Sequence, residues 1–77
     1  MRHELKTWTP YFELIMDRVK EFEIRKDDRG FTVGDELLLR EYRNNYTGRE
    51  LLVTIIYKLE GGQFGIEKGF CVLGIKL

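Results

Sequence analysis

The sequence contains a single cysteine, a single proline and no excess charge of either sign. A lone cysteine cannot form an internal disulfide, and no cluster of cysteines and histidines is present to bind zinc. No apolar run approaches the ~18 residues of a membrane span, and charged residues interrupt the first twenty positions where a signal peptide would need an apolar stretch. These absences predict a soluble, cytoplasmic protein of a reducing compartment that uses no disulfide.

The composition is sufficient for one folded domain over residues 1–77. Of the 77 residues, 43% are hydrophobic and 13% aromatic, which is enough for an ordinary core. Thirteen basic residues balance thirteen acidic ones, so strong non-specific binding to nucleic acid is not expected, although a local positive patch remains open. Cys71 is expected to be a buried core thiol. No cofactor is expected, and Asp27 and Asp28 supply too few oxygen ligands for a metal site.

One short helix is expected near the N-terminus. Thr9 can cap its first turn with a hydroxyl, and Pro10 suits that turn because a missing N–H costs nothing there. The helix is predicted over residues 10–18, and its core stripe consists of Phe12, Ile15, Met16 and Val19.

Five strands are expected, over residues 2–6, 21–25, 35–42, 49–59 and 70–77. In the second strand, Phe22 and Ile24 are predicted to face the interior while Glu23 and Arg25 face a groove. The leucine run at 37–39 predicts burial on both faces. Asn45 and Gly48 are expected to take left-handed conformations in the hairpin connection at 43–48. The fourth strand has an apolar face formed by Leu51, Val53, Ile55, Tyr57 and Leu59.

A single helix among five strands favours an α+β, mostly β fold. Five strands that must bury two faces around one helix are most economically arranged as a partly closed β-barrel with an N-terminal helix. Such a barrel also protects strand edges that would otherwise promote aggregation.

Several spaced motifs resemble the ASCH domains of the PUA-like superfamily, in particular a small bacterial and phage group expected to bind RNA. They are HELK at 3–6 before a Trp-x-Pro helix start, KEFEIRKDDR at 20–29, FTVGDELLLREY at 31–42, TGR at 47–49, GGQFG at 61–65 and GFCVLG at 69–74. The resemblance implies a PUA-like β-barrel with a cleft beside the helix. Many such domains bind RNA or modified bases, and a few ASCH relatives are ribonucleases.

The sequence departs from that group at two positions. Arg18 stands where the group has a glycine that ends the helix, which predicts a different helix end. Glu21 stands where the group has a threonine directly after the lysine. One ASCH relative hydrolyses acetylated cytidine with a lysine and a threonine three residues on. Lys20 matches that lysine but Glu23 replaces that threonine, so the resemblance does not extend to this activity.

The favoured function is an RNA- or nucleotide-binding module. Arg25 would grip a phosphate or base edge with two N–H groups, Glu23 would accept from an exocyclic amine, and Trp8 would stack on a base. A simple ion pair between Glu23 and Arg25, and simple packing by Trp8, are the alternatives. Phe64 is either a lid over the ligand or a plug of the barrel. The predicted ligand-binding residues are Lys6, Trp8, Lys20, Glu23, Arg25, Lys26, Arg29 and Phe64.

Two other functions remain open. One is a small hydrolase or ribonuclease in which Lys20 or His3 acts as a base with Glu23 as partner. In that case Lys20 would need to be buried. The other is a protein-interaction domain without a small ligand.

Overall fold

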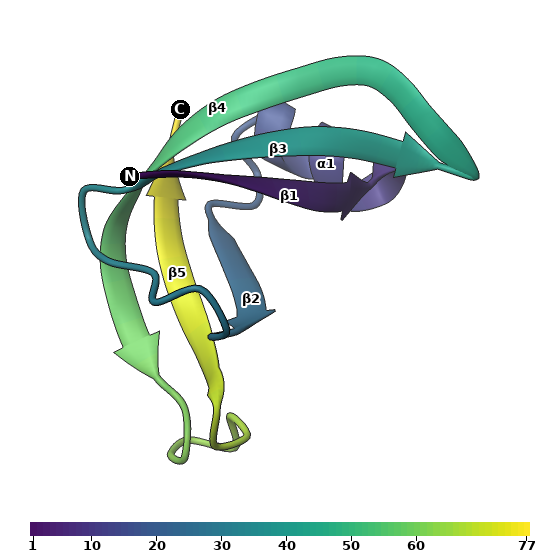
Figure 1. The fold of residues 1–77 in the computed structure, drawn as a ribbon. Coiled ribbons are helices and arrows are strands. Elements are labelled where there is room, and N and C mark those ends of the chain that lie inside the picture. The colour runs from purple at the N-terminus through teal and green to yellow at the C-terminus, as the bar shows by residue number, and fades with distance from the viewer.

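The expected order of strand, helix and four strands is present in the computed structural model, which describes all 77 residues (Figure 1). The elements are β1 (Arg2–Trp8), α1 (Thr9–Met16), β2 (Phe22–Lys26), β3 (Glu36–Arg43), β4 (Asn45–Glu60) and β5 (Phe70–Lys76). The fold is therefore α+β and mostly β, as predicted. With eight residues, α1 is too short to span a membrane.

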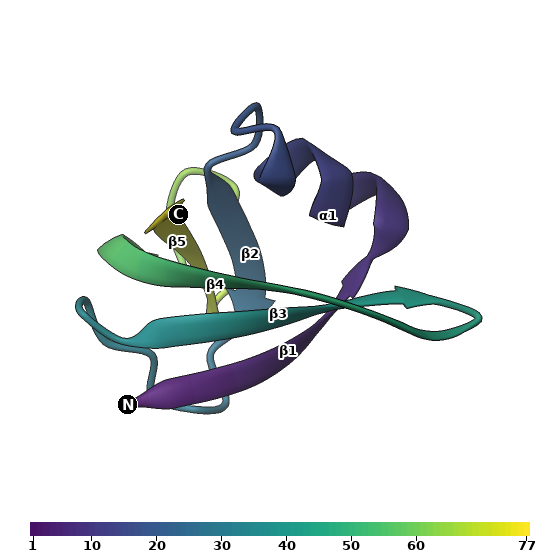
Figure 2. The same cartoon turned by 90° about the horizontal axis from the view of Figure 1, so that it is seen from above.

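The five strands form one sheet in the order β1-β3-β4-β5-β2. β1 runs parallel to β3, and the other neighbours are antiparallel. The long strand β4 bends so that its first half pairs with β3 and its second half with β5 (Figure 1). This bend curls the sheet into a half-barrel whose edge strands, β1 and β2, lie on either side of its open side (Figure 2).

The apolar core lies inside the curl of the sheet. Leu37 and Leu39 are fully buried while Leu38 between them is only half-buried, so the predicted burial on both faces is partial. Cys71 is buried as predicted, and this burial raises the pKa of its thiol. The buried apolar residues are Leu5, Phe12, Ile15, Phe31, Leu37, Leu39, Val53, Ile55, Cys71, Leu73 and Ile75.

The apolar face of β4 is shorter than predicted. Alternation holds as far as Ile55, where the pairing with β5 shifts register before Tyr57. An extra residue in one strand inverts the side-chain alternation beyond it. Tyr57 is therefore exposed, and Lys58 turns inward, where its ammonium lies 2.6 Å from a carboxylate oxygen of Asp27.

The helix is also shorter than predicted. It ends at Met16, so Met16 and Val19 are exposed and only Phe12 and Ile15 are buried. Thr9 makes no side-chain cap, because Trp8 is the residue before the first turn and Thr9 already lies within it.

We expected the helix to end differently because arginine stands where the ASCH group has glycine. The conformation of Arg18 shows that this expectation is wrong. Arg18 adopts a left-handed conformation with φ 61°. The N–H of Val19 donates to the Leu14 carbonyl (2.9 Å), and the N–H of Arg18 donates to the Ile15 carbonyl (3.0 Å). This pair of bonds is the Schellman arrangement that usually has glycine at the Arg18 position. Arg18 therefore adopts a left-handed conformation that is strained for a residue with a side chain.

The connection between β3 and β4 is tighter than expected. Asn44, rather than Asn45, takes the left-handed conformation (φ 64°), while Gly48 does so as predicted (φ 92°). Beneath this hairpin, the buried carboxylate of Glu41 accepts from Arg49 Nε and Nη2, both at 2.8 Å. Hydrogen bonds from Arg49 and then Thr47 lower the pKa of Glu41 to about 2. The pair anchors the base of the hairpin to the half-barrel.

Candidate functional site

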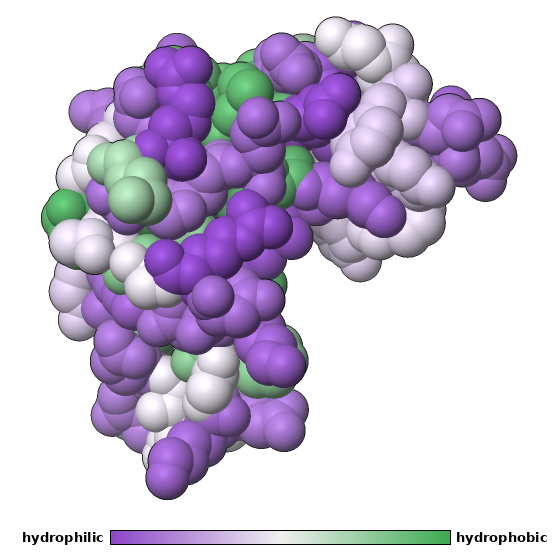
Figure 3. All heavy atoms as spheres, viewed as in Figure 1, coloured by the Kyte–Doolittle hydropathy of each residue, from purple (hydrophilic) through white to green (hydrophobic).

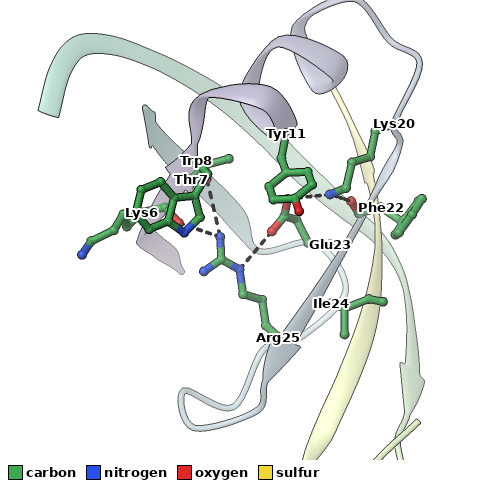
Figure 4. Close-up of a pocket in the computed structure, with 9 residues that line it drawn as sticks. All are labelled: Lys6, Thr7, Trp8, Tyr11, Lys20, Phe22, Glu23, Ile24 and Arg25. Carbon is green, nitrogen blue, oxygen red and sulfur yellow. Dashed lines mark hydrogen bonds and ion pairs between the residues drawn. The ribbon is translucent and has the colours of Figure 1, made fainter. Parts of the chain in front are cut away.

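A cleft of about 620 Å³ lies between the end of β1, the start of α1 and strand β2 (Figure 4). Its volume falls in the range of small-molecule sites, roughly 300–1,000 Å³. In Figure 3 the surface is hollowed on this side of the molecule, and hydrophilic residues cover most of the face in view. The cleft is lined by Lys6, Thr7, Trp8, Tyr11, Lys20, Phe22, Glu23, Ile24 and Arg25.

A buried carboxylate with two cationic partners lies at the centre of the cleft. Glu23 is 5% exposed. Its Oε1 lies 3.0 Å from Lys20 Nζ, and its Oε2 lies 2.9 Å from Arg25 Nε. A carboxylate withdrawn from water is tolerated only with such partners. The sequence prediction that Glu23 and Arg25 share a concave, polar face agrees with this geometry.

Arg25 also connects the two edges of the half-barrel. Its Nη2 donates to the backbone carbonyl of Lys6 on β1 (2.9 Å) and lies 3.5 Å from Thr7 Oγ1. Farther along, Arg29 Nη1 donates to the carbonyl of Glu4. Edge strands present unpaired backbone groups, and here two guanidinium groups satisfy carbonyls of β1 in place of a neighbouring strand.

The interior placement predicted for Phe22 and Ile24 is wrong. Phe22 is 44% and Ile24 51% exposed. Strict alternation correctly separates these two residues from Glu23 and Arg25, but it does not say which set faces inward. β2 is an edge strand that pairs only with β5, and no other element covers its outer face, so the apolar set lies outside.

Two aromatic rings lie beside the polar centre. Trp8 is 53% exposed, and its ring packs edge-on against Tyr42 with 5.3 Å between centroids. Lys6 Nζ lies 4.3 Å from the centroid of the same tyrosine. Tyr11, on α1, is half-exposed and lies 5.7 Å from Lys20 Nζ. The cleft therefore combines cations, one carboxylate and accessible aromatic faces.

Sequence reasoning missed Thr7 and Tyr11, and it also missed Phe22 and Ile24 as lining residues because it assigned them to the interior. Thr7 continues the alternation of His3 and Leu5 along β1, so extending that strand by two residues would have found it. Tyr11 gave no such signal, because helical spacing does not show that this ring turns toward β2.

Three predicted residues lie outside the cleft lining. Lys26 is exposed at the end of β2, and Arg29 contacts β1 beyond the cleft. Phe64 is 83% exposed on the loop between β4 and β5, and this loop lies at the end of the molecule away from α1 (Figure 1). The structure thus brings together Lys6, Trp8, Lys20, Glu23 and Arg25.

His3 also lies apart from the cleft lining. It is buried at the start of β1, with Nε2 2.9 Å from Asp35 Oδ2 and its ring edge-on to Phe31. The hydrogen bond from His3 is the largest cause that lowers the pKa of Asp35 to about 2. The contacts of His3 are those of a strand histidine with a satisfied hydrogen bond.

The charged turn after β2 is stabilised by a hydrogen bond within the turn and by an ion pair with β4. Asp27 accepts from the Phe31 N–H at 3.2 Å and pairs with Lys58. The hydrogen bond from Lys58 is the main cause that lowers the pKa of Asp27. No group of three or more histidine, cysteine, aspartate or glutamate side chains gathers to hold a metal ion.

The chain is therefore a small, mostly β half-barrel domain with a polar cleft beside its only helix. The chain belongs to the DUF3850 family, described as a domain of unknown function, which it matches over residues 2–75. It is also similar to the "uncharacterized 12.9 kDa protein in GpA 3′ region" of Escherichia phage P2, with 40% identity over 50 residues. That match covers 64% of this chain and 46% of the phage protein, so it spans less than half of the relative's length.

Proposed function

We propose that this domain binds single-stranded RNA, with one nucleotide unit held in the cleft between β1, α1 and β2. The observation that carries the proposal is the convergence of Lys20, Glu23 and Arg25 beside two accessible aromatic rings. Aromatic platforms stack on bases without regard to sequence, and cations contact the phosphates.

The cleft has hydrogen-bond donors available for an anion. Arg25 uses Nε and Nη2 within the protein, and its third guanidinium nitrogen, Nη1, makes no hydrogen bond. Lys20 Nζ donates to Glu23 and to the Phe22 carbonyl, so one of its three N–H bonds is free. Two cations contact the Glu23 carboxylate, and Lys6, whose ammonium lies over the Tyr42 ring, adds a third cation at the rim. This local excess of positive charge exists although the whole chain is neutral.

A polymer is favoured over a free nucleotide by the surface that continues from Trp8. Tyr42 packs edge-on against Trp8, and Tyr46 packs against Tyr42 with 5.2 Å between centroids. Arg40 lies 4.2 Å from the centroid of Tyr46. Neighbouring bases of a bound strand would meet this row of aromatic and basic groups.

We also propose that the family is related to the ASCH domains of the PUA-like superfamily. The mostly β half-barrel and the cleft beside its N-terminal helix support this placement.

Fluorescence anisotropy with a labelled single-stranded RNA decamer tests the proposal. Affinity should fall as salt rises, because bound phosphates release counterions. Trp8→Ala should cost about 1–3 kcal/mol of binding free energy, and Lys20→Met should weaken binding and reduce the salt dependence. The matched controls are Tyr57→Ala, an exposed aromatic outside the cleft, and Lys68→Met, an exposed lysine on the β4–β5 loop. Equal losses in variants and controls would refute a specific cleft.

A hydrolase or ribonuclease is the second candidate, favoured by one observation. The Lys20 side chain is 17% exposed and lies 3.0 Å from Glu23, which satisfies the requirement for burial. However, an ammonium that donates to a carboxylate and a carbonyl acts as a donor in this arrangement, which favours binding ahead of catalysis. Turnover of RNA or acetylated nucleosides by the wild-type chain, lost in Glu23→Gln, would instead support the enzyme.

A further inference from the structure

One wall of the cleft is an unpaired strand edge. β2 is the last strand of the sheet and pairs only with β5. The carbonyl of Glu21 accepts from the Ile75 N–H (3.0 Å), and the Asp27 N–H donates to the Gly69 carbonyl (2.8 Å). Backbone groups alternate in direction along a strand. The odd-numbered residues therefore bond to β5, and the N–H and C=O groups of Phe22, Ile24 and Lys26 face away from it.

Among the cleft-lining residues on this edge of β2, Ile24 alone has both backbone groups without a partner. The Phe22 carbonyl is occupied by Lys20 Nζ at 2.7 Å, and Lys26 lies outside the lining. Ile24 lines the cleft, and neither a side chain nor a loop backbone group bonds to its N–H or C=O. A donor and an acceptor thus stand side by side next to Glu23, with the aromatic rings of Trp8 and Tyr11 nearby (Figure 4).

We propose that the N–H and C=O of Ile24 bind the Watson–Crick edge of an unpaired base, an inference that rests on the proposed RNA-binding function. Each of the four bases carries an adjacent donor and acceptor on this edge. Adenine and cytosine offer a ring nitrogen acceptor beside an amine, whereas uracil and guanine offer a ring N–H beside a carbonyl. The backbone of Ile24 would therefore distinguish unpaired from paired bases but would not distinguish one base from another. Duplex RNA, whose edges are already engaged, would be rejected.

A flat ring suits this wall better than an extended peptide. A peptide that adds a strand needs a row of free backbone groups on the edge. Here the Phe22 carbonyl is already occupied, and Arg25 crosses from β2 to the Lys6 carbonyl directly beside Ile24. The free edge within the cleft is one residue long.

The first test compares nucleotides with and without a blocked edge. The probes are uridine 5′-monophosphate with 3-methyluridine 5′-monophosphate, and adenosine 5′-monophosphate with its N6,N6-dimethyl derivative. In ¹H–¹⁵N NMR titrations, each parent should bind about tenfold more tightly than its methylated partner, because the methyl group leaves buried polar groups unpaired. The Ile24 amide proton should move downfield only with the parents. Equal affinity within both pairs, with an unmoved Ile24 amide, would overturn this inference and leave RNA binding intact. Absence of binding by all four nucleotides and by the RNA decamer would overturn the proposed function and this inference together.

The second test removes the donor from the protein. Ile24→Pro deletes an N–H that is not part of the ladder with β5, at an edge position where proline is tolerated. Provided that circular dichroism shows the wild-type spectrum, this variant should lose the tenfold preference for the unblocked nucleotides. Ile24→Val changes the side chain and keeps the N–H, and should retain that preference. A folded Ile24→Pro variant with the wild-type preference would overturn the inference, and the nucleotide comparison decides the matter if that variant does not fold.

Discussion

Replacing Arg25 by alanine should lower the free energy of unfolding far more than the loss of an ordinary surface arginine. Arg25 makes one hydrogen bond to Glu23 and one to the Lys6 carbonyl, both at 2.9 Å, and thereby connects strand β2 to β1 across the open side of the half-barrel. The variant leaves the buried Glu23 carboxylate with Lys20 as its one remaining cation.

The magnitude follows from these two contacts. A hydrogen bond with a charged partner contributes about 1.5–3 kcal/mol when shielded from water, and the partial exposure of Arg25 reduces that value. We therefore expect a total loss of about 2 kcal/mol. For a domain of this size, each kcal/mol lowers the midpoint of thermal unfolding by about 4–8 °C, so the midpoint should fall by about 8–16 °C.

Urea unfolding followed by circular dichroism measures the change, and Arg43→Ala is the matched control. Arg43 is exposed at the end of β3, and its removal should change the unfolding free energy by less than about 0.5 kcal/mol. A double-mutant cycle with Glu23→Gln should give a coupling energy of about 1 kcal/mol or more, since the two side chains are in contact. An Arg25→Ala variant as stable as the Arg43→Ala control would refute the reasoning.

Three further predictions follow from single residues. Arg18→Gly should raise the unfolding free energy by about 0.5–1 kcal/mol in thermal unfolding, because glycine adopts the left-handed conformation without strain while losing more chain entropy; Arg18→Ala should give no such gain. The pKa of Glu41 is about 2 in the folded chain against an ordinary 4.5, so its pairing with Arg49 stabilises the fold fully above about pH 4.5 and is lost as the pH falls toward 2. Unfolding free energies of wild type and Glu41→Gln should therefore converge over that interval, and a constant difference would contradict the assignment. The Cys71 thiol should react with a disulfide reagent at pH 8 only after unfolding, because it is buried and its pKa is raised; rapid reaction in the native state would show an accessible thiol.

Local pattern predicted the order of elements but not the features that depend on distant pairing. The Thr9–Pro10 start, the alternation at 22–25 and the buried Cys71 are visible in neighbouring residues. The exposure of Phe22 and Ile24 depends on β2 being an edge strand, and that position results from contacts made by β5. Likewise, the residues near Ile55 carry no pattern that predicts the register shift that turns Tyr57 outward.

The candidate site was predictable where its residues belong to one strand or its flanks. Strand alternation puts Glu23 and Arg25 on one face, and Lys20, just before the strand, is close enough in sequence to reach Glu23. The contribution of β1 was only partly foreseen, because the Lys6 carbonyl acts through its backbone and carries no side-chain signal. Tyr11 reaches the cleft through the orientation of the helix on the sheet, which packing determines.

The open seam between β1 and β2 also affects how copies of this chain meet. Exposed strand edges are the usual starting points for self-association and fibril growth. Here the two edges face one another across the seam, and the guanidinium groups of Arg25 and Arg29 already occupy carbonyls of β1. A strand from a second molecule would have to displace both arginines before it could pair along β1. The edge of β1 is thus protected against strand addition although no strand covers it on that side.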